Sequence, residues 1–220
     1  MRPLRSLAPS FLFLLAASTL AAQTGGLELT VYAGPNYSWQ SGTAVEGTDG
    51  QLGVSIGLHL HQPIQGNWSV DPELNFAYKG ANSRTSTSTA GERVVSSRLW
   101  YLQVPVPIRF AVFNGPSTRV RLFAGPFIAI RAGCTAELES AGLVASESCT
   151  DLHPLSDTTV VFDPYKTWDA GFVAGAGFSF PLFHVRFDVD LRYEAGLLNV
   201  SRLTGTVRNR TVMLAVGVPF

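Results

Sequence analysis

The sequence predicts an all-β fold, a closed eight-stranded antiparallel up-and-down β-barrel. First, apolar residues occupy every second position in eight segments, which is the period of a β-strand with two different faces. Second, long and short connections alternate along the chain, as in a meander of antiparallel strands. Third, beyond the N-terminus no apolar run reaches the roughly 18 residues that a membrane-spanning helix needs.

The segment at residues 184–194 shows the alternation most clearly. Every residue between its apolar positions is charged or titratable, and a helix would spread both sets around its circumference. The alternation alone leaves open which face meets water, because soluble and membrane barrels share it. The apolar positions are Val185, Phe187, Val189, Leu191 and Tyr193.

Seven further segments repeat this pattern. Residues 81–97 and about 132–165 lack apolar periodicity, so we expect long loops there. The predicted strands are residues 27–39, 51–61, 68–79, 100–112, 119–130, 168–180, 184–194 and 212–220.

The connections between these strands alternate between long and short. In an up-and-down barrel, all four long connections then lie at one end, and the three short turns lie at the other end with both chain termini. This asymmetry is typical of bacterial outer-membrane barrels, whose short turns and termini face the periplasm.

Residues 1–22 have the features of a signal peptide for Sec export, which leaves residues 23–220 as one barrel domain. Arg2 and Arg5 precede a short apolar run, and Ala21 and Ala22 form a small-residue exit. The alternative is a membrane-anchor helix, for which the apolar run is short.

Aromatic residues gather at both ends of the apolar faces, which favours lipid outside and a polar lumen inside. Two such girdles are typical of transmembrane barrels, and the polar faces mix small residues with charges of both signs, as a narrow interior requires. We expect Trp39, Tyr78, Trp100, Trp168 and Tyr193 at the long-loop end, and Trp68, Phe180 and Phe220 at the short-turn end.

The charged residues of the polar faces are expected to form ion pairs that fill the lumen. Buried charges are costly unless they are paired, and an eight-stranded interior is about filled by its own side chains. The alternative is an ion or proton path. The predicted network comprises Glu28, Asp71, Glu73, Lys79, Arg109, Arg119, Arg121, Asp169, Arg186, Asp188, Asp190, Arg192 and Glu194.

The two cysteines, Cys134 and Cys149, lie in one polar segment. An exported chain with an even cysteine count favours a disulfide between them. A zinc site is the alternative, but His153 supplies only one further ligand nearby.

No catalytic, cofactor or metal motif is predicted. Lys and Arg total 16 and Asp and Glu total 16, so no basic surface points to nucleic acid. His59 and His61 share a strand face at a spacing that can bind metal, but ordinary hydrogen bonding is the simpler interpretation. Asp188 and Asp190 could act as a catalytic carboxyl pair, although flanking arginines favour ion pairing.

Four segments together resemble the PorT-like outer-membrane β-barrel family, which is common in the Bacteroidota. The resemblance implies an outer-membrane location and a barrel architecture, and one class of the family assists protein secretion. Pro107, a second proline in its strand, departs from the family pattern. The segments are YLQVPVPIRF at 101–110, GPFIAI at 125–130, DAGFVAGAGFSF at 169–180 and RYEAGLLNV at 192–200.

These observations predict an integral protein of the bacterial outer membrane that is not an enzyme. Its partners would be outer-membrane lipid and possible envelope or secretion-complex proteins, and its role structural or binding. One alternative is a secreted lipocalin-like barrel with an apolar ligand inside. Another is an outer-membrane enzyme acting on lipid or peptide, for which Asp169 or Glu194 would be the residues to test.

Overall fold

The structure is a computed structural model that describes residues 27–43, 45, 48–87, 91–140, 143–149 and 164–220. The predicted signal peptide at residues 1–22 and His153 lie outside the described residues. Every described element is a β-strand, so the all-β prediction is confirmed. The strands are β1 (Glu28–Ser41), β2 (Thr48–Gln65), β3 (Trp68–Val70), β4 (Glu73–Thr87), β5 (Gly91–Pro105), β6 (Ile108–Asn114), β7 (Arg119–Ser140), β8 (Leu143–Ser148), β9 (Trp168–Leu182), β10 (Val185–Gly196) and β11 (Arg208–Pro219).

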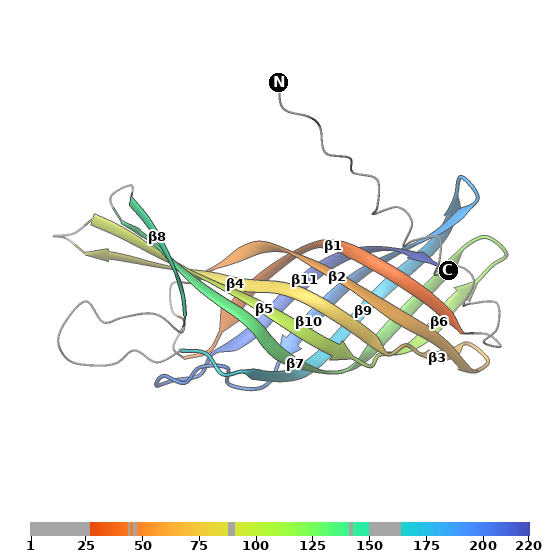
Figure 1. The fold of residues 1–220 in the computed structure, drawn as a ribbon. Coiled ribbons are helices and arrows are strands. Elements are labelled where there is room, and N and C mark those ends of the chain that lie inside the picture. Colours follow the sequence, from red (N-terminus) through yellow and green to blue (C-terminus); the bar gives the residue numbers. More distant parts are fainter. Residues whose placement is uncertain (1–26, 44, 46–47, 88–90, 141–142, 150–163) are drawn as a thin grey trace, which may run out of the picture.

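The strands form one antiparallel sheet that returns on itself (Figure 1). β1 pairs with β2 on one side, from Glu28 opposite His61, and with β11 on the other, from Thr30 opposite Pro219. Pairing then runs in sequence order from β2 to β4, β5, β7, β9, β10 and β11. The short strands β3 and β6 pair with each other and join β2 to β7, and β8 pairs with β7. The first and last strands of the sheet, β1 and β11, are therefore hydrogen-bonded to each other, which closes the sheet. In the described part of the chain, no helix has the length and apolar character that a membrane crossing requires.

The predicted strand count of eight is wrong, because the described residues form eleven strand segments. Two predicted strands are each broken at a proline, between β3 and β4 at Pro72 and between β5 and β6 at Pro107. Proline has no backbone N–H, so it cannot donate to the ladder at these positions. Each proline carbonyl still accepts, Pro72 from Leu60 at 3.0 Å and Pro107 from Asp71 at 3.0 Å.

In their described parts, the two predicted loops at residues 81–97 and about 132–165 are largely strand, which is the second correction. β4 and β5 extend as a hairpin to the pair Thr87 and Gly91. β7 continues to Ser140 and pairs with β8 from Thr135 opposite Ser148. Within each hairpin, the backbone N–H and C=O groups pair with each other, so the strands need no apolar face to form. The extensions therefore lack the alternation of apolar residues by which a strand is predicted from sequence. They project from one end of the barrel, on the left of Figure 1.

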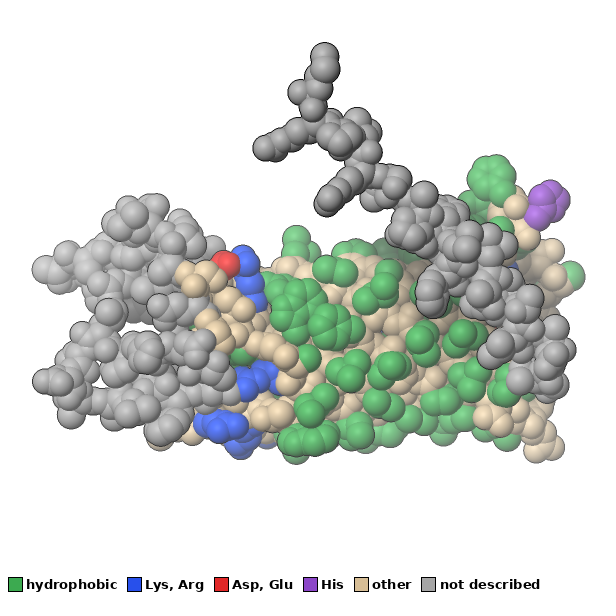
Figure 2. All heavy atoms as spheres, viewed as in Figure 1, with side chains coloured by type: hydrophobic (Ala, Val, Ile, Leu, Met, Phe, Trp, Pro, Cys, Tyr) green, Lys and Arg blue, Asp and Glu red, His purple; other side chains and the backbone are tan. Residues whose placement is uncertain are grey.

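The two faces of the sheet differ in chemistry along the barrel wall. On β10, Val185, Leu191 and Tyr193 are exposed on the outer face, whereas Asp190 and Arg192 are buried in the lumen. The wall segments of β1, β2, β4, β7, β9 and β11 divide in the same way, and Figure 2 shows hydrophobic side chains across the middle of the face in view. An apolar outer surface of this extent is costly in water and suits a lipid environment.

Aromatic rings pack against each other on the outer face near both ends of the barrel. Toward the long connections, Trp39 lies 6.2 Å from Tyr193 and Trp100 lies 4.9 Å from Tyr78, between ring centroids. Trp168 begins β9 at the same end and is 57% exposed.

At the short-turn end, Trp68 lies 4.7 Å from Phe110, and Phe180 lies 6.2 Å from Phe187. Phe220 follows β11 there and donates its backbone N–H to Leu29 at 2.7 Å. The rings therefore form two bands that bound the apolar surface.

The turn between β9 and β10 holds two non-glycine residues in the left-handed region. Phe183 has φ of 50° and His184 has φ of 67°. L-residues with a Cβ pay about 1 kcal/mol or more each in this conformation, which asparagine and glycine tolerate best. The turn between β2 and β3 instead uses Gly66, with φ of 60°.

We predict that replacing Phe183→Asn and His184→Gly together raises the free energy of unfolding by about 1–2 kcal/mol, because the turn strain is relieved. Urea unfolding in lipid vesicles, followed by tryptophan fluorescence, measures the change. Gly66→Ala is the matched control and should lower stability by about 1 kcal/mol, although open space surrounds that position. Equal stabilities for all three proteins would contradict this account of the turns.

Candidate functional site

The most deeply buried charges lie where β4, β6 and β10 face each other across the lumen. Glu73 accepts hydrogen bonds from Arg192 Nη2 at 2.5 and 2.6 Å, one to each carboxylate oxygen. Arg109 Nη2 donates to the same Glu73 at 3.1 Å, and all three residues are at most 3% exposed. One carboxylate thus bridges two guanidinium groups from strands that are not neighbours in the sheet.

The network continues toward the short-turn end through two aspartates of β10. Asp190 accepts from Arg109 Nη1 and from Arg121 Nη2, each at 2.9 Å. Asp188 lies 3.2 Å from Arg121 Nη2, and Asp71 lies 2.8 Å from Arg109 Nε. The close pair Asp188 and Asp190 is therefore shared between arginines rather than facing open solvent.

A separate buried pair lies nearer the long-loop end. Lys79 Nζ donates to Glu194 Oε2 at 2.6 Å, and Gln103 Nε2 donates to the same oxygen at 3.3 Å. Lys79 Nζ also lies 5.2 Å from the ring centroid of Phe127, in cation–π range. The pair is buried on all sides, so its geometry resembles a structural ion pair.

Aromatic faces and small residues make room for these charges. The Arg109 guanidinium lies 4.7 Å from the Phe123 ring centroid, and that of Arg192 lies 5.1 Å from Tyr32. Tyr32 Oη donates to Glu73 Oε2 at 3.0 Å. A Cβ added at Gly57 would come 2.7 Å from the Tyr32 ring, so glycine is required where this large lumen side chain crosses β2.

Four of the predicted charges lie at the edges of the network. Arg186 pairs with Glu28 at the short-turn mouth, where both side chains are about a third exposed. Arg119 Nε donates to Asn114 Oδ1 at 3.0 Å, and the described residues hold no acidic partner for it. Asp169 accepts from Asn209 Nδ2 at 2.9 Å and has no cationic partner in that same set.

The neutral members of the site, such as Tyr32, Gln103 and Asn209, carried no charge signal in the sequence. Their inward position follows from the alternation alone, since each occupies the face opposite the apolar one.

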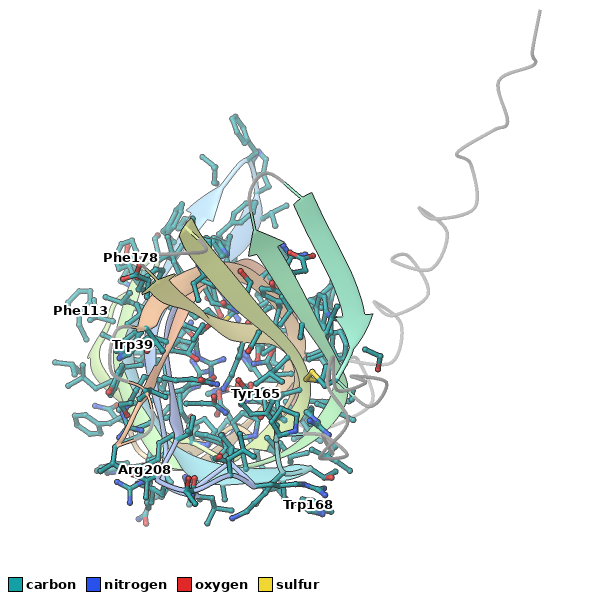
Figure 3. All side chains as sticks on the ribbon, turned by 90° about the vertical axis from the view of Figure 1, so that its left-hand side faces the viewer. Trp39, Phe113, Tyr165, Trp168, Phe178 and Arg208 are labelled. Carbon is teal, nitrogen blue, oxygen red and sulfur yellow. A yellow bond between two sulfur atoms is a disulfide. The ribbon has the colours of Figure 1, made fainter. Side chains whose placement is uncertain are left out.

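Toward the long loops, apolar side chains and two tyrosines pack against each other. Leu99, Tyr101, Phe127 and Ala129 form a buried cluster against which Tyr165 packs. Tyr165 lies over the barrel mouth in Figure 3, and its Oη donates to Ser97 Oγ at 2.8 Å. A cavity of about 290 Å³ remains beside it, lined among others by Gln40, Ser201 and Val207.

A disulfide joins Cys134 on β7 to Cys149 after β8, with the two Cα atoms 5.4 Å apart. Cys134 packs against the same apolar cluster as Tyr165, so the bond ties the β7–β8 hairpin to this cluster. In the chain-entropy model, closing a loop of this length contributes about 3 kcal/mol to stability.

The short-turn mouth contains a cavity of about 200 Å³ lined by charged groups. His61 Nδ1 lies 3.0 Å from Asp71 Oδ1, and His59 Nε2 lies 4.0 Å from Asp71 Oδ2. Within the described ranges, no three His, Cys, Asp or Glu side chains are arranged to hold a metal ion. Both histidines therefore lie beside the buried carboxylate of Asp71.

A comparison with known families matches residues 21–202 to the outer membrane protein beta-barrel domain. The chain belongs to this outer-membrane β-barrel family. It is therefore an integral protein of the bacterial outer membrane, as the apolar outer face requires. The lipocalin-like alternative is wrong, because this barrel carries its apolar face outside and buries its charges inside.

Solved structures of other outer-membrane proteins are similar to this barrel at low identity. Ail, the attachment invasion locus protein of Yersinia pestis, is 16% identical over 88% of this chain and 98% of its own, with a TM-score of 0.42. Neisserial surface protein A is 14% identical over 89% and 98%, with a TM-score of 0.45. OprG of Pseudomonas aeruginosa is 12% identical over 88% and 95%, with a TM-score of 0.49. A comparison with curated proteins gives no match.

We predict that Glu73→Gln lowers the free energy of unfolding of this barrel by about 3–5 kcal/mol, because it leaves Arg109 and Arg192 without their shared carboxylate. Urea unfolding in vesicles measures the loss. Glu28→Gln is the control: its pair with Arg186 is partly exposed, so the expected loss is below about 1 kcal/mol. Similar losses for both variants would show that burial of an ion pair does not determine how much stability is lost when its carboxylate is removed.

We predict that Lys79→Met with Glu194→Leu is better tolerated than either single change. Each single change strands one buried charge, whereas the double change removes both charges and retains apolar volume. A double-mutant cycle of unfolding free energies measures the coupling, expected at about 2–3 kcal/mol. Additive losses would show that the two side chains act independently.

Proposed function

We propose that this barrel does not conduct and that it works as a surface-exposed binding or structural module of the outer membrane. The observation that carries this proposal is the filled lumen. A layer of ion-paired arginines and carboxylates occupies the middle, and the apolar cluster with Tyr165 occupies the loop end. Two lumen cavities, one at each end of the described barrel, share no lining residue, which supports a lumen without a continuous path.

The side chains that fill the lumen also argue against catalysis. Asp169 and Glu194, the residues that an enzyme acting at the loop rim would use, are each 2% exposed and hydrogen-bonded within the lumen. An acid or base that cannot reach a substrate contributes nothing to its turnover. We therefore assign no enzymatic role, cofactor or metal to this chain.

The proposed orientation places the long connections at the cell surface and both termini in the periplasm. The short turns after β2, β6 and β9 and the ends of the described chain share one end of the barrel in Figure 1. Sec export through residues 1–22, and membership of the PorT-like group within the wider family, belong to the same proposal and are supported by the sequence motifs.

A second candidate role is partnership with an envelope or secretion complex on the periplasmic side. Phe183 is 87% exposed at the tip of the strained β9–β10 turn, and Phe113 is 55% exposed beside the β6–β7 turn. Large exposed aromatic residues on protruding turns are common anchors at protein interfaces. These turns therefore offer a contact surface distinct from the outer loops.

We predict that the full chain reconstituted in planar bilayers gives no discrete conductance steps, because paired charges and apolar residues fill the lumen. A control is the same preparation after denaturation, which should also remain silent. Reproducible single-channel openings from folded, heat-modifiable protein would overturn the closed-lumen proposal.

We predict that a photo-reactive residue at Leu203, exposed at the loop end, captures a discrete protein partner in intact cells. The same residue at Phe183 tests the periplasmic partner, and at Leu191, which faces outward from the middle of β10, it should capture lipid only. Gel shifts after illumination are the readout. Absence of protein adducts at both ends would contradict both binding roles.

A further inference from the structure

Exposed cationic side chains are concentrated at the loop end of the barrel. Figure 2 shows Lys and Arg at the left border of the hydrophobic surface. Arg119 and Arg186, at the opposite end, line the lumen mouth instead. The exposed cations at the loop end include Arg98, Lys166, Arg202 and Arg208.

Two of these cations flank a groove at the start of β9. Lys166 and Arg202 line this groove of about 570 Å³ together with Trp168 and Leu198. The backbone holds the two sides together, since Lys166 donates its N–H to Val200 at 2.7 Å and Arg202 donates its N–H to Pro164 at 2.9 Å. These hydrogen bonds hold the backbones of Lys166 and Arg202 in place, while both side chains are exposed and can reach a ligand.

The groove joins an apolar wall to a cationic one. Trp168 is 57% exposed and Leu198 is 45% exposed, and Trp168 belongs to the aromatic band at the loop end of the lipid-facing surface. No carboxylate is among the described residues that line the groove. Neither the Lys166 ammonium nor the Arg202 guanidinium has an ionic or hydrogen-bond partner within the described ranges. A ligand that suits this site combines an anion with a hydrocarbon chain.

We propose that this groove binds a lipid of the outer leaflet through a phosphate in its headgroup. The phosphate lies between Lys166 and Arg202, and the first acyl chain lies along Trp168 and Leu198. A lipid fits better than a free anion, because exposed cations alone hold a small anion weakly in water and the apolar wall would then have no role. The choice of leaflet rests on the proposed orientation, whereas binding itself does not.

Native mass spectrometry of the full chain released from nanodiscs tests this site. The nanodiscs contain phosphatidylcholine with a minor fraction of phosphatidic acid, which presents an exposed phosphate. We expect one phosphatidic acid to be retained preferentially. Arg202→Gln with Lys166→Gln should reduce that retention about tenfold, consistent with the contribution of two surface cations.

Arg208→Gln is the matched control for charge. Arg208 is an exposed arginine at the same end, points outward in Figure 3, and does not line the groove, so its loss should leave retention unchanged. Equal losses for Arg202→Gln and Arg208→Gln would overturn a defined site and indicate only a general charge effect.

Two further arms separate the lipid from a free anion. Trp168→Ala should weaken retention of phosphatidic acid, and millimolar inorganic phosphate should not displace the lipid. Displacement by inorganic phosphate, or full retention by Trp168→Ala, would overturn the lipid assignment. A conducting lumen or a missing protein partner would contradict the proposed function but would leave these lipid-binding results unchanged. Failure of the proposed function can therefore be told apart from failure of the lipid site.

Discussion

The carboxylate of Glu73 holds together parts of the barrel that the β-sheet cannot join. Sheet hydrogen bonds connect each strand only to its neighbours, and β4, β6 and β10 are not neighbours. Glu73 on β4 reaches Arg109 on β6 and Arg192 on β10 across the lumen. Removal of these groups from water is costly unless they are paired. Arg192 has Glu73 as its one ion-pair partner among the described residues, whereas Arg109 also pairs with Asp71 and Asp190. Glu73 is thus the anion that the two guanidinium groups share.

The broken strands place the members of this cluster. Pro72 separates Asp71 from Glu73, and Pro107 precedes Arg109 by two residues, so both breaks adjoin network residues. The breaks also face each other, because Asp71 donates its N–H to the Pro107 carbonyl. A proline carbonyl accepts as well as any other, and the ladder loses only the donor at each break. Backbone pairing therefore stays nearly complete where the sheet changes course.

The alternation of residue types predicts the strands of the barrel wall and the direction of their side chains, because a lipid-facing wall imposes the period of two at every position. It could not predict the hairpin extensions of β4 with β5 or of β7 with β8, which have no apolar side to repeat. The break at Pro107 was signalled by the proline itself.

The partner of each charged residue was harder to predict from the sequence than the strands were. Which arginine meets which carboxylate depends on how far each strand is shifted along its neighbour, and that register is a property of the closed sheet. Arg119, for example, contacts Asn114 across its own turn, and Asp169 is matched by an amide. Residue type identified the lumen charges as a group, but only the register assigns their partners.

The middle and the loop end of the lumen differ in the side chains that line them, and both differ from the exposed outer surface. In the middle, opposite charges neutralise each other, so an incoming ion would have to separate buried pairs. Toward the loops, Tyr165 packs against the apolar cluster, and a cavity of about 290 Å³ remains beside it. At the exposed rim, by contrast, Lys166, Arg202 and Trp168 keep both charge and apolar area available. In the proposed barrel with a closed lumen, discrimination among surrounding molecules takes place on the outer face and at the loops.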